Sequence, residues 1–78
     1  DREIARLREL IDQRRNQMDS VTVAVIEKNL AVIDTAIAES KRAIAQDPSS
    51  RFLIEFLNQS LQTKMELMRT AALLPSRI

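Results

Sequence analysis

Five residue types are missing from the 78-residue sequence: glycine, cysteine, histidine, tryptophan and tyrosine. The lack of glycine disfavours tight turns and loops that cradle phosphate groups. The lack of cysteine and histidine removes thiol chemistry and the usual zinc ligands. It also excludes disulfides, so cysteine usage does not indicate a redox compartment. We therefore expect no catalytic residue, no cofactor, no metal and no enzymatic activity.

A charge excess of one sign and a long apolar run are also missing. Twelve basic and eleven acidic residues give a net charge of +1, and the two signs are interspersed. This balance disfavours binding to nucleic acid or to a membrane surface. The sequence contains no apolar run long enough to span a bilayer. It starts at Asp1 without a methionine or signal peptide and ends soon after Pro75, which predicts a single helical domain excised from a longer protein.

The stretch from Ser20 to Gln46 has the strongest pattern in the sequence. Its first stripe follows the heptad spacing of a helix that packs on another helix, and consists of Val23, Ile26, Leu30, Ile33, Ile37, Ser40 and Ile44. A second stripe lies about 100° round the same helix, and consists of Val21, Val25, Val32, Ala36 and Ala43. Because two apolar stripes need two neighbours, we predict that residues 20–46 form the central helix of an antiparallel assembly.

The first predicted break in the helical pattern lies at Asp19-Ser20. We expect Asp19 to cap the following helix by accepting hydrogen bonds from backbone N–H groups. Met18 and Val23 would then stand at the positions of a hydrophobic staple. An alternative is one helix running through the break, because a seven-residue stripe continues across it: Ile4, Ile11, Met18, Val25 and Val32. We favour the break.

The second predicted break lies at Asp47-Pro48. Aspartate at the N-cap with proline at the first helical position is a strong helix-start signal. The helix that follows is predicted to end at about Leu74, before Pro75, and its apolar arc is wide. It contains Leu53, Ile54, Phe56, Leu57, Leu61, Met65, Leu67, Met68, Ala71 and Ala72.

These patterns together predict an all-α fold. An antiparallel hairpin of helices over about 20–46 and 48–74 is joined by an N-terminal helix over about 3–18. The same pattern suits a three-helix bundle or a dimeric hairpin. In the hairpin, contacting residue numbers should sum to about 94, which sets Ile26 opposite Met68 and Leu30 opposite Lys64. We expect the Ser40 hydroxyl to bond to the carbonyl one turn earlier, and the Lys64 ammonium to reach solvent.

One stripe of small residues is a candidate interaction surface. Alanine recurs every seven residues on the face away from both apolar stripes, at Ala24, Ala31, Ala38 and Ala45. Small side chains let a second helix approach closely, so these alanines are a candidate interface for a homodimer or another protein. The alternative explanation is that alanine simply favours helix.

The other groups with potential chemistry are interpreted as structural. Methionines 18, 65 and 68 are expected to fill gaps in the core rather than bind a metal. Glu27, Asp34 and Glu39 are expected to be solvated surface carboxylates. Asn29 is expected to be a satisfied amide that is buried or at the boundary of the core.

Most of the chain resembles one protein family. The segments are TVAVIEKNLAVIDTAIAESKRAIAQDPSSRFL and KMELMRTAALLP. They resemble the C-terminal extracytoplasmic helical region of bacterial membrane-anchored anti-sigma factors of the zinc-finger family, whose pattern is VIExNLxxIDxAIAEA, a DP turn, and KLELLRxAA. The upstream EIARLRELIDQRR resembles the family's preceding helix. Matching residues are Val25, Ile26, Glu27, Asn29, Leu30, Ile33, Asp34, Ala36, Ile37, Glu39, Asp47, Pro48, Leu53, Lys64, Glu66, Leu67 and Arg69. Ser20 departs from the family, where proline commonly follows the aspartate.

The resemblance implies an architecture for the whole protein. Such proteins have a cytoplasmic domain that binds zinc and a sigma factor, one transmembrane helix, and an extracytoplasmic helical domain, which this chain would be. The family's zinc motif has no counterpart here, so sigma-factor binding and the membrane helix would both belong to segments upstream. We expect a non-enzymatic periplasmic regulatory domain that contacts itself or another protein through helix packing. The alternative is a cytoplasmic helical interaction or scaffold module.

Overall fold

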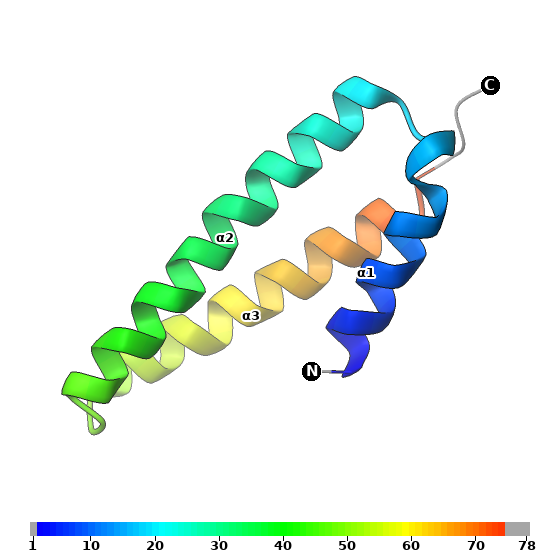
Figure 1. The fold of residues 1–78 in the computed structure, drawn as a ribbon. Coiled ribbons are helices and arrows are strands. Elements are labelled where there is room, and N and C mark those ends of the chain that lie inside the picture. The colour runs from blue at the N-terminus through cyan, green and yellow to red at the C-terminus, as the bar shows by residue number, and fades with distance from the viewer. Residues whose placement is uncertain (1, 75–78) are drawn as a thin grey trace.

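The computed structural model describes residues 2–74, which form three α-helices and contain no strand. The predicted all-α class is confirmed. The helices are α1 (Arg2–Arg14), α2 (Ser20–Gln46) and α3 (Arg51–Ala72), and a short 3₁₀ turn, η1 (Arg15–Gln17), follows α1 (Figure 1). The N-terminal helix predicted over about 3–18 is therefore an α-helix with a 3₁₀ turn at its end.

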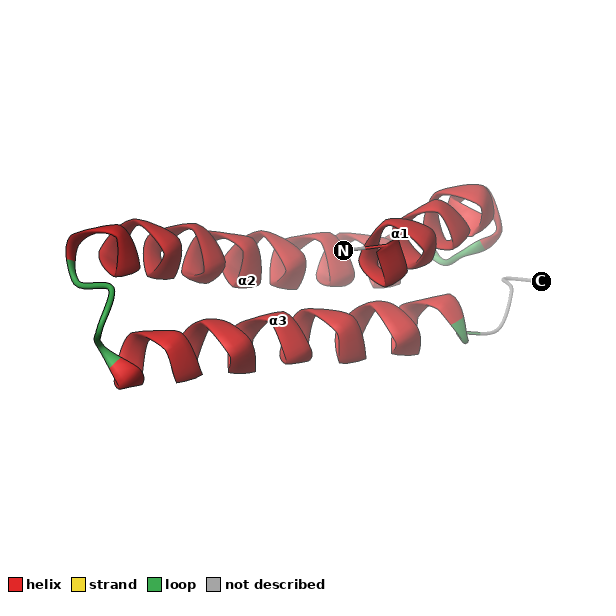
Figure 2. Cartoon of the chain, turned by 90° about the horizontal axis from the view of Figure 1, so that it is seen from below, coloured by secondary structure: helices red, strands yellow, loops and turns green. Residues whose placement is uncertain are grey.

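Helix α3 is the element that both other helices share. α2 and α3 form the antiparallel hairpin, and α1 diverges from α2 at the end opposite the hairpin turn (Figure 1). α1 and α2 lie in one layer, and α3 lies in the other (Figure 2). The prediction that residues 20–46 form the central helix is therefore wrong. The wide apolar arc belongs to α3, so α3 can pack against two neighbours, whereas α1 leaves the second stripe of α2 uncovered.

The main core lies where α1 crosses the hairpin. Its buried members come from all three helices and from the turn between α1 and α2: Ile11, Met18, Ile26, Leu30, Met68 and Ala71. Met68 is 1% exposed and is the largest fully buried side chain. Farther along the hairpin, Ile37 and Ser40 are buried. Within residues 2–74, the three helices share one core, as in the first of the two predicted arrangements.

The first predicted break is confirmed, but its cap differs from the prediction. Met18 and Asp19 both have extended backbone, so α1 and α2 are separate helices. The Asp19 carboxylate accepts no backbone hydrogen bond; it accepts one from the Thr22 hydroxyl, at 3.3 Å. Met18 is buried and Val23 packs against the same cluster, as a hydrophobic staple requires.

The second break is also present, and here the predicted cap is wrong. Asp47 ends α2 by donating its N–H to the Ala43 carbonyl at 3.0 Å. Its carboxylate accepts from the Ser49 hydroxyl at 3.2 Å, which holds it within the turn. Ser50 is the N-cap of α3, and its hydroxyl accepts from Leu53 N–H at 3.3 Å. The helix thus starts at residue 51 rather than 48. It ends at Ala72 rather than 74; Pro75, the predicted stop, lies outside the described residues.

This assignment of the cap predicts a difference between two alanine substitutions. Ser50→Ala removes the only side-chain acceptor at the first turn of α3 and should lower the free energy of unfolding by about 1 kcal/mol. Asp47→Ala leaves the α3 cap intact and should cost less. Urea unfolding followed by circular dichroism measures both. A larger loss of unfolding free energy for Asp47→Ala than for Ser50→Ala would show that the aspartate caps α3 after all.

The predicted hairpin register is confirmed within one helical turn. Ile26 and Met68 belong to one buried cluster. Leu30 and Lys64 line one groove, and Lys64 reaches Asp34, one turn beyond Leu30. The Ser40 hydroxyl donates to the Ala36 carbonyl at 2.7 Å, as predicted, so a buried serine is satisfied within its own helix.

Candidate functional site

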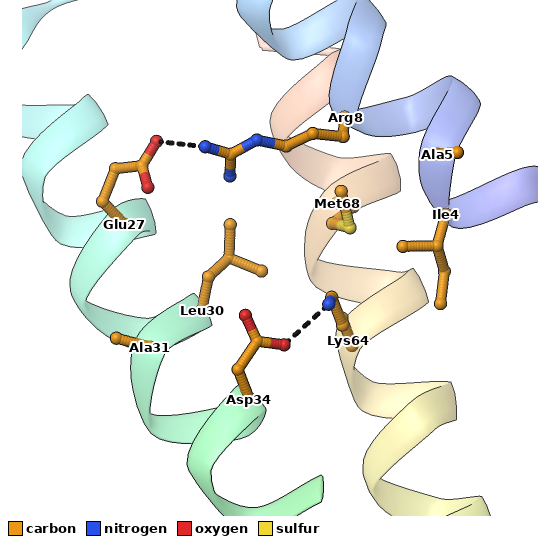
Figure 3. A pocket seen from close by; sticks show the side chains of 9 residues that line it. All are labelled: Ile4, Ala5, Arg8, Glu27, Leu30, Ala31, Asp34, Lys64 and Met68. Atoms are coloured by element: carbon orange, nitrogen blue, oxygen red, sulfur yellow. Dashed lines mark hydrogen bonds and ion pairs between the residues drawn. The ribbon is translucent and has the colours of Figure 1, made fainter. Parts of the chain in front are cut away.

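An open groove of about 490 Å³ lies between α1 and the α2–α3 hairpin. Leu30 and Met68 contribute apolar surface, and four charged side chains stand around it (Figure 3). The lining residues are Ile4, Ala5, Arg8, Glu27, Leu30, Ala31, Asp34, Lys64 and Met68. Each of the four charged groups has a partner of opposite sign, so the groove is electrically balanced.

The ion pair between Lys64 and Asp34 joins α3 to α2. Lys64 Nζ lies 2.6 Å from Asp34 Oδ1, and the Lys64 side chain is 21% exposed (Figure 3). The buried stem agrees with prediction. The ammonium, however, binds a carboxylate rather than simply reaching solvent. The reason is the register, which places Asp34 one turn beyond Leu30 on the same side of the hairpin.

Glu27 is the meeting point of two arginines from the N-terminal segment. Arg15 Nη2 lies 2.6 Å from Glu27 Oε1, and Arg8 Nη2 lies 3.5 Å from the same atom (Figure 3 draws the Arg8 pair). Both arginines also contact Asp12, at 3.5 Å from Arg8 and 3.1 Å from Arg15. The hydrogen bonds to Asp12 and Glu27 raise the pKa of the Arg15 guanidinium. The network therefore links α1 to the flank of α2 by charge.

We expect Glu27→Gln to loosen α1 without unfolding the hairpin. The pairs are partly solvent-exposed, so the loss of unfolding free energy should be under about 1 kcal/mol, and smaller at high salt. A double-mutant cycle with Arg15→Met measures the coupling directly. Glu66→Gln, an exposed change on α3, is the matched control. A coupling that does not change between low and high salt would contradict the electrostatic account.

The polar lining of the groove consists of charged residues that pair with one another. Its lining side chains include no serine, threonine, cysteine or histidine, and its carboxylates, lysine and arginine form ion pairs. Within residues 2–74, no three metal-ligating side chains gather to hold an ion. The paired charges and the apolar floor instead suit the packing of helices. Glu27 and Asp34 were predicted to be solvated carboxylates; both are ion-paired, because their partners come from other parts of the fold.

The predicted alanine stripe lies at the surface. Ala24, Ala31, Ala38 and Ala45 are all exposed, and Ala31 also lines the groove. No described segment covers the stripe. Asn29 is exposed as well, rather than at the core boundary, and donates to the Val25 carbonyl at 3.0 Å. Met18 and Met68 are buried core residues, as predicted, and Met65 is half-buried.

Exposed large apolar side chains occur at several other places: Leu10 on α1, Ile54 on α3 and Leu73 just after α3 are 41%, 42% and 83% exposed. On α2, Val21, Val25 and Val32 are 53–69% exposed. On α3, Phe52 and Phe56 are 72% and 40% exposed, and their rings stack with centroids 6.2 Å apart. These are the only aromatic residues of the chain. The sequence signal for the valines was the second stripe, which was wrongly predicted to be covered by a neighbouring helix. Phe56 was part of the predicted apolar arc of the last helix, and Phe52 was not identified from the sequence.

Comparison with known proteins leaves the family unassigned. Neither protein-family models, nor curated proteins, nor solved structures gave a match to this chain. Among the helices of residues 2–74, none combines the length and the apolar character that crossing a bilayer would require.

Proposed function

We propose that this chain is a non-enzymatic regulatory domain that works through helix–helix contacts with itself or another protein. The observation that supports this most is the set of large apolar side chains left exposed on α2 and α3. Exposed apolar clusters of this kind commonly mark protein interaction sites. The charged groups of the groove pair with one another, so they are not offered to an ionic substrate.

The finer proposal is the extracytoplasmic domain of a transmembrane anti-sigma factor. Its support is the sequence resemblance over α2, the Asp47-Pro48 turn and α3. In this proposal the domain lies in the periplasm, and its contacts influence the release of a sigma factor held by an upstream cytoplasmic domain. The connection to that domain would be an upstream membrane helix.

The coding sequence upstream of Asp1 provides the first test. The anti-sigma proposal expects about 20 consecutive apolar residues, preceded by a histidine and a Cys-x-x-Cys cluster. A soluble upstream domain with neither feature would contradict it. The remaining proposal would then be a cytoplasmic helical interaction module.

A transcription reporter tests the regulatory role itself. Deleting residues 20–74 from the parent protein, with the upstream part intact, should change the response of a sigma-dependent reporter to its inducing condition. A variant with several substitutions in the exposed face of α1, which keeps the hairpin, is the control. An unchanged reporter response after the deletion would overturn the regulatory proposal.

A further inference from the structure

We propose that a second copy of this chain covers the side of the hairpin opposite α1. This inference rests on the proposed role in helix–helix contacts, and it names the surface and the partner. We call the surface the valine–phenylalanine face, and it consists of Val21, Val25 and Val32 on α2 and Phe52 and Phe56 on α3. All five side chains are at least 40% exposed.

The two helices present these residues on one side because α1 occupies the other side. On α2, the side chain of Ile26 is in the core. Glu27 lies about 100° round the helix axis from Ile26 in one direction and binds Arg15, directly after α1. Val25 lies about 100° from Ile26 in the other direction. On α3, Met68 is in the core, and Arg69 follows it and binds Glu3 of α1 through Nε at 3.0 Å.

The position of Phe56 on α3 completes this argument. It lies about 120° from Met68 in the direction away from Arg69. Both helices therefore turn a charged flank toward α1 and an apolar flank away from it.

The α3 half of the valine–phenylalanine face has no charge. Beyond Phe56, the same flank of α3 continues with Gln59 and Thr63. On α2, the flank contains two charged residues, Lys28 and Glu39, which have opposite signs. The face therefore has no net charge that would select a charged partner, and a second copy can match its two opposite charges.

The order of residues along α2 favours a second copy paired antiparallel about a twofold axis. Lys28 and Glu39 border the face with opposite charges. An antiparallel alignment of two α2 helices sets Lys28 of one copy beside Glu39 of the other. Within one residue, the same alignment sets Val32 against Ala36 and Val25 against Ala43. Large side chains thus meet small ones, as in interdigitating helix packing, and both border charges are neutralised.

The area of the face is sufficient for a stable dimer. α2 has 27 residues, which at 1.5 Å per residue is about 40 Å of length. Two helices about 9 Å apart give a face roughly 18 Å wide, so a copy could bury on the order of 700 Å². Specific interfaces bury about 800 Å² per partner. Without the second copy, the five apolar side chains remain in water.

The mass of the intact 78-residue chain in solution tests this inference. Sedimentation equilibrium across a range of concentrations should give twice the monomer mass of 8.9 kDa. Val32→Arg should raise the dissociation constant roughly 100-fold or more, because a cation would be buried near the twofold axis. Val32 is exposed in the monomer, so the variant should fold, and circular dichroism checks this. The matched control is Ala31→Arg with Ala38→Arg, on the predicted alanine stripe of the same helix.

A charge exchange tests the antiparallel alignment with little change in apolar contact. K28E alone should weaken the dimer several-fold by placing two glutamates together, and K28E with E39K should recover it. Failure of the double variant to recover the dimer would overturn the alignment.

Each outcome of the mass measurement decides the inference. Loss of the dimer in Val32→Arg but not in the alanine control supports it. A wild-type chain that is monomeric at every concentration overturns the inference. The inference is also overturned if both variants lose the dimer or if neither does. If only the alanine control loses the dimer, the interface lies on the alanine stripe instead. None of these results bears on the reporter experiment, so the proposed function stands or fails separately.

Discussion

Replacing Met68 with alanine should lower the free energy of unfolding by about 3 kcal/mol, within the range for buried large-to-small changes. Met68 is 1% exposed and belongs to the core cluster, whose members come from α1, α2 and α3. The total free energy of unfolding of a native protein is only about 5–15 kcal/mol. The variant should therefore lose a large part of its stability, and its thermal midpoint should fall by many degrees.

Urea unfolding at one fixed protein concentration measures this effect, because self-association would otherwise add a concentration-dependent contribution. Met68→Leu keeps most of the volume and should cost under about 1.5 kcal/mol. Gln62→Ala, an exposed change on the same helix, is the surface control. A loss for Met68→Ala no larger than that for the surface control would contradict the position of the core.

Replacing Arg14 with methionine should lower the free energy of unfolding by about 2 kcal/mol, the second largest effect that we expect. The Arg14 guanidinium donates to the carbonyls of Ala72 and Leu74. The last carbonyls of a helix lack partners within it, and a cation at a helix C-terminus is favourable. Hydrogen bonds to charged groups contribute about 1.5–3 kcal/mol. The substitution keeps an apolar stem and removes both donors.

Hydrogen exchange distinguishes a local effect of the Arg14 hydrogen bonds on the end of α3 from a general loss of stability. In Arg14→Met, amides in the last turn of α3 should exchange faster, while amides near the hairpin turn should change little. Arg6→Met, at an exposed position of the same helix, should leave both regions unchanged. Equal acceleration along all of α3 would show that Arg14 acts on the whole fold rather than on the end of α3.

These two residues explain why α1 folds back onto α3. Ile11 and Met18 add to the core around Met68, and Arg14, one helical turn after Ile11, reaches the end of α3. In the sequence, Arg14 continues the heptad spacing of the apolar residues Leu7 and Ile11, where a charge is unexpected. Its partners are 58 and 60 residues away, so only the folded chain reveals what the charge does.

The two sides of the hairpin have different roles as a consequence of this docking. One flank receives α1 and contains the ion pairs of Glu27 and Asp34. The other has the exposed valines and phenylalanines. Regulation through helix contacts needs a surface that is free in the monomer. The second flank meets that condition without any rearrangement of α1.

Local sequence patterns were enough to predict the helical class, the two places where the chain turns, and the register of the hairpin within one helical turn. These follow from local physics: a seven-residue apolar repeat, the breaks beside Asp19 and Asp47, and a short connection that forces antiparallel packing. The Ser40 hydrogen bond was predictable for the same reason, because its acceptor lies one turn earlier in the same helix.

The choice of the shared helix, the flank that α1 takes and the pairing of the charges depend on long-range packing. A periodic pattern shows that a face is apolar, but it does not say which neighbour covers that face. For this reason the valine stripe of α2 was predicted to be covered by a second neighbour, whereas α3 is the helix that has two neighbours. Ion pairs such as Lys64–Asp34 and Arg69–Glu3 join residues 30 and 66 positions apart. Their existence depends on the crossing of whole helices, which the local pattern does not determine.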